Sequence, residues 1–382
     1  MIYLDNAASA PVEPAAMNTA LPFMTECCAN PSSILHAEGR KAALAIIKAR
    51  KQCTDAINAK EDEIVFTSGG TESNNLALRG AAELMAKTGK RHIITTSIEH
   101  PSVLNTCKML EMDGFEITYL PVSKSGILSS KAVENALRPD TALVSVMTAN
   151  NEIGTLQPIS SIGKLCRKHG VLFHTDAVQA VGQVELDVKK QNIDLLTCSA
   201  HKLGGLKGSG FLYIRKGLDL APLLYGGGQE QGIRSGTENT AGIVALGAAI
   251  TIAYSDIKAK QKQLSELRDL LISLLLEIPD SRLNGSPTQR LCSNVNVSFG
   301  EVEGESLVLN LDLAEICCSS GSACASGSSE PSYVLKAIST PPKYLNGSLR
   351  LTLSHHNTEE EIRTAAAAVA DSVKRLRELT HP

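Results

Sequence analysis

EIVFTSGGTESNNLALRGAAELMAK, residues 63–87, decides the fold class of this chain. An apolar run of strand length, a glycine turn and an amphipathic pattern of helical period follow one another within it. The next stretch repeats this order, with HIITTS at 92–97 followed by PSVLNTCKMLEMDG at 101–114. Strands that alternate with helices are typical of an α/β protein built on a parallel sheet.

Five further runs of strand length continue the series: ITYLPV, ALVSVMTA, VLFHTDA, DLLTCSA and GFLYIR. We therefore predict one mainly parallel, seven-stranded sheet covered by helices on both faces. Beyond residue 256 the pattern changes to a charged helix, the short strands SNVNVSFG and GSLRLTLS, and a final helix. The predicted division is a large domain over 14–256 and a smaller α+β domain over 1–13 and 257–382.

Composition indicates a globular enzyme rather than a nucleic-acid or membrane protein. The 382 residues are 43% hydrophobic, with a net charge of −3 and no basic run. The first residues, MIYLDNAASAPVEP, lack the basic start and apolar run of a signal peptide. The most apolar stretch, 241–257, is rich in Gly and Ala and shorter than a membrane span. We expect a cytoplasmic protein without a membrane anchor or a nucleic-acid partner.

The ten cysteines are too dilute for a disulfide framework and show no C-x-x-C spacing. Most are expected to be reduced and buried, where a free cysteine acts as a small hydrophobe. These are Cys53, Cys107, Cys166, Cys198 and Cys292. Two adjacent pairs, 27–28 and 317–318, do not match metal-ligand spacing either, so we expect no metal site.

Polar residues follow the predicted strands where open α/β sheets bind ligands. Gly69, Gly70 and Thr71 offer backbone N–H groups and a hydroxyl to a phosphate at a helix N-terminus, although a plain helix cap explains them equally well. Asp176 ends an apolar run, where it either meets a cation such as a pyridinium N–H or caps a turn. Lys202 follows DLLTCSA and either projects into the same crevice or lies on a surface loop.

The segment CCSSGSACASGSSEPS, residues 317–332, carries Cys324 among small and polar residues. Such stretches are usually plain flexible connections. Together with Lys202, however, the segment suggests a thiol that a mobile loop brings to a site where a lysine holds a cofactor by an imine.

Taken together, the motifs resemble the NifS/IscS group of cysteine desulfurases, which are pyridoxal-phosphate enzymes of the fold-type-I aminotransferase class. The resemblance covers essentially the whole chain. It is carried, in order, by YLDNAASAP, NPSSILHAEGRKA, FTSGGTESNN, IEHPSV, NNEIGTLQP, HTDAVQAVG, SAHKLGGLKGSG, GGGQEQGIRSGTEN and SSGSACASG.

The resemblance implies a role for each matching residue. Lys202 would hold pyridoxal 5'-phosphate and move the substrate α-proton, and His100 would stack on the pyridine ring and assist proton transfer. Asp176 would keep the pyridinium nitrogen protonated. The remaining implied cofactor contacts are Gln179 at the phenolic oxygen, Gly70, Thr71, Ser199 and His201 at the phosphate, and Thr237 reaching into the partner subunit's site of a homodimer.

Substrate binding and sulfur transfer are also implied by the resemblance. Arg350 would grip the carboxylate of L-cysteine, with Asn151 assisting. The thiolate of Cys324 would attack the substrate sulfur, release alanine and keep a persulfide for an acceptor protein, such as an iron–sulfur scaffold. The chain departs from its relatives at Leu206, Gln231 and Ser354, where proline, arginine and glycine are common.

Several alternatives stay open at this point. The sulfur could serve tRNA thiolation or DNA phosphorothioation, or the enzyme could be a selenocysteine lyase, an aminotransferase or a β-lyase. A catalytically minor subunit that mainly docks partner proteins would be a different class, but retention of the catalytic positions argues against it.

Overall fold

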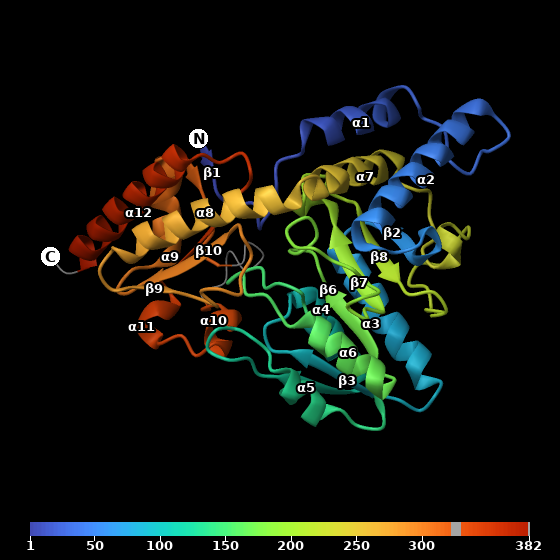
Figure 1. The fold of residues 1–382 in the computed structure, drawn as a ribbon, viewed down its shortest axis with the longest axis horizontal. Helices are drawn as coiled ribbons and strands as arrows, with labels where there is room; N and C mark the ends of the chain where they lie inside the picture. The colour runs from blue at the N-terminus through green and yellow to red at the C-terminus, as the bar shows by residue number, and fades with distance from the viewer. Residues whose placement is uncertain (322–329, 381–382) are drawn as a thin grey trace.

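The computed structural model describes residues 1–321 and 330–380. A seven-stranded sheet forms the centre of the larger part, in the order β2-β8-β7-β6-β5-β3-β4 (Figure 1). Its strands are β2 (Ile64–Thr67), β3 (His92–Thr96), β4 (Glu116–Leu120), β5 (Thr141–Ser145), β6 (Leu172–Asp176), β7 (Leu195–Ser199) and β8 (Gly210–Ile214). The predicted α/β fold with a mainly parallel, seven-stranded sheet is confirmed.

One strand departs from the parallel pattern. β8 pairs antiparallel with both β7 and β2. The connection from β7 to β8 contains the short 3-10 turn Ala200–Lys202 and no crossover helix. Because antiparallel neighbours need no crossover, the chain can turn back directly after Lys202.

Except for the edge strand β4, every strand of the large sheet is buried along its whole length, which explains why these strands read as mainly apolar runs. Within β2, Ile64 and Phe66 join one hydrophobic cluster and Val65 joins the other. Helices α3 (Gly70–Ala86) and α4 (Pro101–Met112) pack on the Val65 side, and α2 (Ala37–Ile57), α6 (Ile159–His169) and α7 (Thr240–Tyr254) pack on the opposite side.

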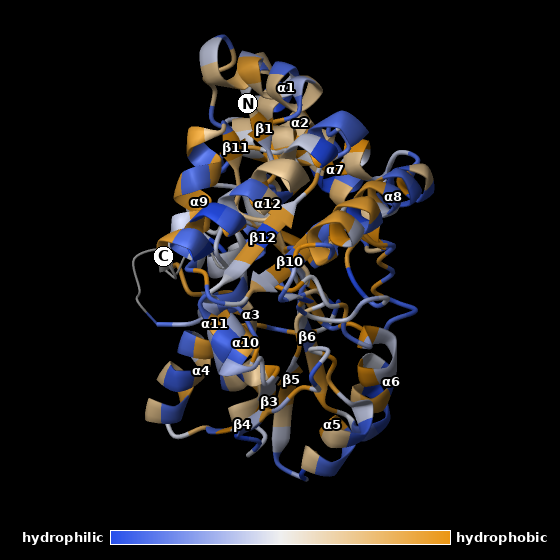
Figure 2. Ribbon diagram, turned by 90° about the vertical axis from the view of Figure 1, so that its left-hand side faces the viewer, coloured by the Kyte–Doolittle hydropathy of each residue, from blue (hydrophilic) through white to orange (hydrophobic). Residues whose placement is uncertain are grey.

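A second core lies at the other end of the molecule (Figure 1). It is built around the antiparallel sheet β12-β10-β9. Its elements are α8 (Ile257–Leu276), β9 (Ser281–Leu283), β10 (Asn294–Phe299), α9 (Gly304–Leu313), β12 (Ser348–Thr352) and α12 (Glu359–Thr380). Both hydrophilic and hydrophobic residues occur along α8 and α12, as expected for helices with one face on a core (Figure 2).

The N-terminal residues join this second core. β1 (Ile2–Tyr3) pairs with β11 (Ile316–Cys317), and Leu4 is fully buried among the residues of the smaller sheet. The segment then runs across to α1 (Pro14–Thr25), which packs on α7 through small buried alanines. The remaining α-helices of the described residues are α5 (Ser130–Ala136), α10 (Tyr333–Ala337) and α11 (Pro342–Leu345). The predicted domain boundaries stay a prediction.

The apolar stretch near 241–257 and five of the cysteines are predicted to be buried. The apolar stretch near 241–257 forms α7, which is packed against the large sheet. Within the described ranges no single helix has the length and apolar composition of a membrane span, and α7 passes together with α8 only as a pair bent by 73°. Every cysteine of the described part is free, and the five predicted to be buried are buried.

Candidate active site

A cavity of about 200 Å³ lies where the carboxyl ends of the large-sheet strands face β12. Ten of the predicted site residues line it. They are Gly70, Thr71, His100, Asn151, Asp176, Gln179, Ser199, His201, Lys202 and Arg350. The turns after β2, β3, β6 and β7 contribute residues from one side, and β12 contributes Arg350 from the other. The fold therefore brings together side chains that lie up to 280 residues apart in the sequence.

Lys202 ends the short turn after β7, so its side chain starts at the edge of the sheet. Its ammonium donates to the carbonyl oxygens of Ala7 at 2.5 Å and Ala8 at 2.7 Å. Gln179 donates to the same Ala7 carbonyl at 3.0 Å. The N-terminal segment thus forms one wall of the cavity and holds the lysine within it.

Asp176 is the last residue of β6 and is only 5% exposed. Its Oδ1 accepts from the backbone N–H of Val178 at 3.0 Å, and its Oδ2 accepts from Asn74 at 2.7 Å. Asp176 has no ion-pair partner among the described residues. A buried carboxylate held in this way requires a cation or a strong hydrogen-bond donor, and a pyridinium N–H meets that requirement.

His100 is connected to Asp176 through two further side chains. Its Nδ1 accepts from the backbone N–H of Ser102 at 3.1 Å and lies 2.8 Å from the Ser102 hydroxyl. Asn74 donates to that hydroxyl at 2.8 Å. Burial, opposed by Asp176 and assisted by the Lys202 ammonium, lowers the pKa of His100. Because Nδ1 accepts hydrogen bonds, the neutral ring carries its proton on Nε2.

The start of α3 forms a second, connected cavity. Gly70, Thr71, Ser199 and His201 line both this cavity and the one that holds Lys202. A Cβ on Gly70 would lie 2.8 Å from a methyl group of Val178, so the tight backbone approach depends on glycine. Unpaired N–H groups at the start of a long helix attract a phosphate.

His201 contributes a neutral ring to this end of the site. Burial, together with the nearby charges of Lys202 and Lys207, lowers the pKa of His201 to about 4. Its Nδ1 lies 3.3 Å from the hydroxyl of Ser9. At neutral pH the ring can therefore offer a hydrogen bond without carrying a charge.

Arg350 lies at the middle of β12 and is 1% exposed. Its Nη2 donates to Asp5 Oδ1 at 2.9 Å, and its Nη1 donates to the carbonyl of Asn151 at 3.0 Å. Its Nε and the side-chain oxygen of Asn151 are buried without a hydrogen-bond partner. A guanidinium with unused donor capacity inside a cavity is suited to bind a carboxylate.

Sequence reasoning missed the residues that hold these groups in place. Asn74 lies one helical turn after Gly70, which would have placed both on the same face of α3. Ser102 lies two residues after His100 at the start of α4, where a capping contact is expected. Asp5 is separated from Arg350 by 345 positions, so nothing local in the sequence connects them.

Two predicted residues are not among these ten. Thr237 is exposed and does not line either cavity. Cys324 lies outside the described residues. The phosphate contact of Thr237 and the nucleophilic role of Cys324 therefore stay predictions.

The three departures from related sequences occupy different surroundings. Leu206 packs beside the buried alanines of α1 and α7. Gln231 is exposed and has φ 60°, a backbone conformation that residues other than glycine rarely adopt. The N–H of Ser354 donates to the side chain of Asn357 at 2.8 Å. None of the three lines the cavity shared by Lys202 and Arg350.

Comparisons with known proteins point to one family of enzymes. Residues 2–364 match the family model of the class-V aminotransferases. A cysteine desulfurase IscS of Methanosarcina thermophila is 52% identical over 379 residues, which cover 99% of this chain and 93% of the relative. A solved NifS-like protein superposes with a TM-score of 0.90 at 35% identity and 99% coverage of each chain. A structure of SspA in complex with cysteine has a TM-score of 0.83 at 39% identity, covering 94% of this chain and all of that one.

The chain belongs to the class-V aminotransferase family and, within it, to the cysteine desulfurases of the NifS/IscS type. Its cofactor is pyridoxal 5'-phosphate. The residues fit this group. The buried carboxylate of Asp176 suits a pyridinium nitrogen, Lys202 reaches the same cavity, and the start of α3 suits a phosphate.

Proposed function

We propose that this chain takes sulfur from L-cysteine, releases L-alanine and holds the sulfur as a persulfide on Cys324. The observation that carries this proposal is the arrangement of Lys202 and Arg350 in one cavity. An amine and a carboxylate are the two groups that every α-amino acid presents. A lysine-bound carbonyl cofactor and a buried arginine are suited to bind the two at once.

The ends of the segment that carries Cys324 support its assignment. Ser319 and Arg350 exchange backbone hydrogen bonds of 2.7 and 3.2 Å, which fixes one end beside the arginine. At the other end, Ser332 donates to Glu152 Oε2 at 2.5 Å, next to Asn151. Both ends of the segment therefore lie beside residues that we propose to bind the substrate, which supports the assignment of Cys324 as the nucleophile.

Each proposed residue has a defined part in the reaction. Pyridoxal phosphate supplies an acceptor for the electron pair released at the substrate Cα. Arg350 and Asn151 bind the carboxylate and orient the amino acid. Lys202 takes the α-proton, and His100 stays neutral beside it for proton transfer. The Cys324 thiolate attacks the substrate sulfur; the Cβ–S bond breaks, Cβ gains a proton, and alanine leaves.

We also propose that the enzyme is a homodimer. Large apolar side chains are exposed along α1, α2 and the segment between them: Leu21 at 50%, Met24 at 60%, Leu35 at 95% and Leu44 at 64%. A surface that carries several large exposed apolar side chains is suited to an interface. Its burial against a second copy would also allow Thr237, exposed and away from its own cavity, to reach the partner's phosphate site.

The sulfur acceptor that we propose is a protein of iron–sulfur cluster assembly, with the reaction taking place in the cytoplasm. This destination rests on the family resemblance rather than on a docking surface. The identity of the acceptor does not affect the desulfuration step, because the persulfide forms before any acceptor is needed.

The deciding experiment compares wild type with Cys324→Ala. Purified holoenzyme receives L-cysteine and a reductant, and alanine and sulfide are followed together. We expect both products from the wild type and a loss of at least about a hundredfold in the variant. The closest matched control is Cys28→Ala, because Cys28 is an exposed cysteine away from the cavity. Unchanged alanine and sulfide production by Cys324→Ala would replace this proposal with a lyase that does not use the thiol.

A further inference from the structure

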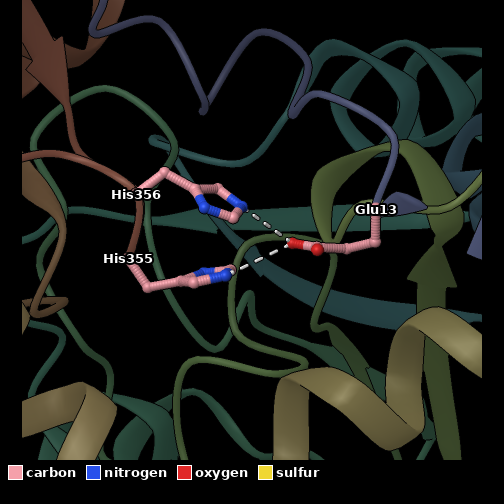
Figure 3. Close-up of side chains that lie close together, drawn as sticks. All are labelled: Glu13, His355 and His356. Atoms are coloured by element: carbon pink, nitrogen blue, oxygen red, sulfur yellow. Dashed lines mark ion pairs between the residues drawn. The ribbon is translucent and has the colours of Figure 1, made fainter. Parts of the chain in front are cut away.

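Glu13, His355 and His356 form a cluster outside the cavity that contains the proposed catalytic groups (Figure 3). Both histidine Nε2 atoms face the same carboxylate oxygen, Glu13 Oε1. The separations are 3.5 Å from His355 and 3.4 Å from His356. The three ligand atoms all lie within 4.8 Å of one another. Two imidazoles and one carboxylate that converge in this way are a donor set for a transition-metal ion.

The fold brings this cluster together from the two ends of the chain. Glu13 directly precedes α1, and its backbone N–H donates to the carbonyl of Gly204 at 2.9 Å. Gly204 lies two residues after Lys202, and a Cβ there would come within 2.6 Å of the Glu13 side chain. The histidines follow β12, the strand that carries Arg350. The cluster therefore joins the segment beside Lys202 to the segment after Arg350.

Both nitrogen–oxygen separations suit a tetrahedral zinc site. Zinc binds imidazole nitrogen and carboxylate oxygen at about 2.0–2.2 Å, so two ligands on one zinc lie about 3.3–3.5 Å apart. The two Nε2–Oε1 separations, 3.4 and 3.5 Å, lie within this range. The two rings lie side by side with centroids 3.9 Å apart, tilted by 40°. Small side-chain rotations would point three lone pairs at one ion.

The surroundings leave room for a further ligand. The Glu13 side chain is 14% exposed, His355 is 33% exposed and His356 is 58% exposed, so the cluster opens to solvent on the His356 side. A water molecule can complete the coordination from there.

Glu13, His355 and His356 line a cavity next to the one shared by Lys202 and Arg350. Two lysines, Lys202 and Lys260, also line this neighbouring cavity and oppose a cation there. Both ammonium groups have other acceptors. Lys260 donates to the carbonyl of Ile252 and to the hydroxyl of Ser255, and Lys202 donates to Ala7 and Ala8. Their charges reduce the affinity of the cluster for a cation without occupying its ligand atoms.

We propose that Glu13, His355 and His356 bind one divalent transition-metal ion of the zinc type, which clamps the segment before α1 to the segment after β12. The prediction of no metal site rested on cysteine spacing and did not consider these residues. The metal would stabilise the relative position of the Lys202 turn and the Arg350 strand, and it takes no part in the sulfur chemistry. The proposal is thus independent of the proposed desulfuration.

The test uses tag-free holoenzyme and Zn²⁺ alone. Equilibrium dialysis with metal analysis gives the stoichiometry and affinity, and thermal unfolding is recorded with and without Zn²⁺. His355→Ala, His356→Gln and Glu13→Gln remove one ligand each. His356→Gln is the safest for folding, because that ring is the most exposed of the three. His169→Ala, at an exposed position on α6, is the matched control.

We expect one zinc per chain, a rise in melting temperature on adding zinc, and at least a tenfold loss of affinity in each ligand variant. The control should bind like the wild type. If the ligand variants retained wild-type affinity, the zinc would lie on cysteine thiolates or elsewhere and the proposal would be wrong. Absence of stoichiometric binding to the wild type would also overturn it and would leave the cluster as a polar contact between Glu13 and the two histidines.

Discussion

Asn74 donates a hydrogen bond of 2.7 Å to the carboxylate of Asp176. This contact ties the first turn of α3 to the end of β6, so the proposed phosphate and pyridinium sites are fixed relative to each other. The second N–H of the same amide donates to Ser102, which contacts His100. One buried amide therefore positions two of the proposed catalytic groups.

Replacing Asn74 with alanine should weaken cofactor binding about tenfold or more. The change removes a hydrogen bond to a charged, buried acceptor, which contributes about 1.5–3 kcal/mol. The measurement is a titration of apoenzyme with pyridoxal phosphate, followed by absorbance. Asn75→Ala is the matched control, because Asn75 follows on the same helix but does not line the cavity. Equal affinities for the two variants would mean that the Asn74 contact does not support Asp176.

Asp5 is expected to act as a positioning residue for Arg350. Its Oδ1 accepts from both Arg350 Nη2 and the Ser319 hydroxyl, each at 2.9 Å. Asp5→Asn keeps the shape but removes the charge that orients the guanidinium, so KM for L-cysteine should rise about tenfold while kcat changes less.

The same kinetic measurement on Arg350→Lys provides the comparison for Asp5→Asn. Arg350→Lys should raise KM more than Asp5→Asn does, because the bidentate geometry is lost. A drop in kcat with unchanged KM in Asp5→Asn would contradict a role in substrate binding.

Buried Glu99 should make stability depend on pH. Burial raises the pKa of Glu99 to about 8, from an ordinary value of 4.5, despite hydrogen bonds from Thr96 and Met147. Because the folded chain holds this proton more tightly, the stabilisation is present below the unfolded pKa and is lost as pH rises toward 8. The loss is up to about 1.4 kcal/mol for each pH unit in this window.

Urea unfolding of the apoenzyme at about pH 5 and pH 8 tests this prediction. Glu99→Gln cannot lose a proton, so its stability relative to wild type should increase between the two pH values. Glu83→Gln, on the exposed face of α3, is the control for a surface carboxyl group. A constant difference between wild type and Glu99→Gln would show that the buried carboxyl does not titrate in this range.

The proposed homodimer predicts that a charge at Leu35 separates the subunits. Leu35 is 95% exposed in the single chain, so Leu35→Asp costs little within the chain but places a buried charge in an apolar interface. Light scattering coupled to size exclusion should show a dimer for wild type and a monomer for the variant. Leu313→Asp, on the exposed end of α9, is the control. A monomeric wild type would refute the homodimer.

Much of this protein could be predicted from its sequence, because the deciding signals are local. Residues 63–87 carry a strand, a turn and a helix in one stretch, and six of the seven strands of the large sheet are short, mainly apolar runs that are buried at every position. Nine of the predicted site residues end or follow strands of the large sheet, and they line one cavity because the carboxyl ends of these strands meet at one edge.

The tertiary structure decided what depends on contacts between distant segments. Neither Asn74 on Asp176 nor Asp5 on Arg350 follows from residue type or spacing, because orientation and distance arise only when helices and strands pack. The same holds for Glu13 beside His355 and His356, which lie at opposite ends of the chain. Sequence determined which elements form and which chemical groups the chain carries; packing determined which of those groups meet, since hydrogen bonds and metal ligation act over only a few ångströms.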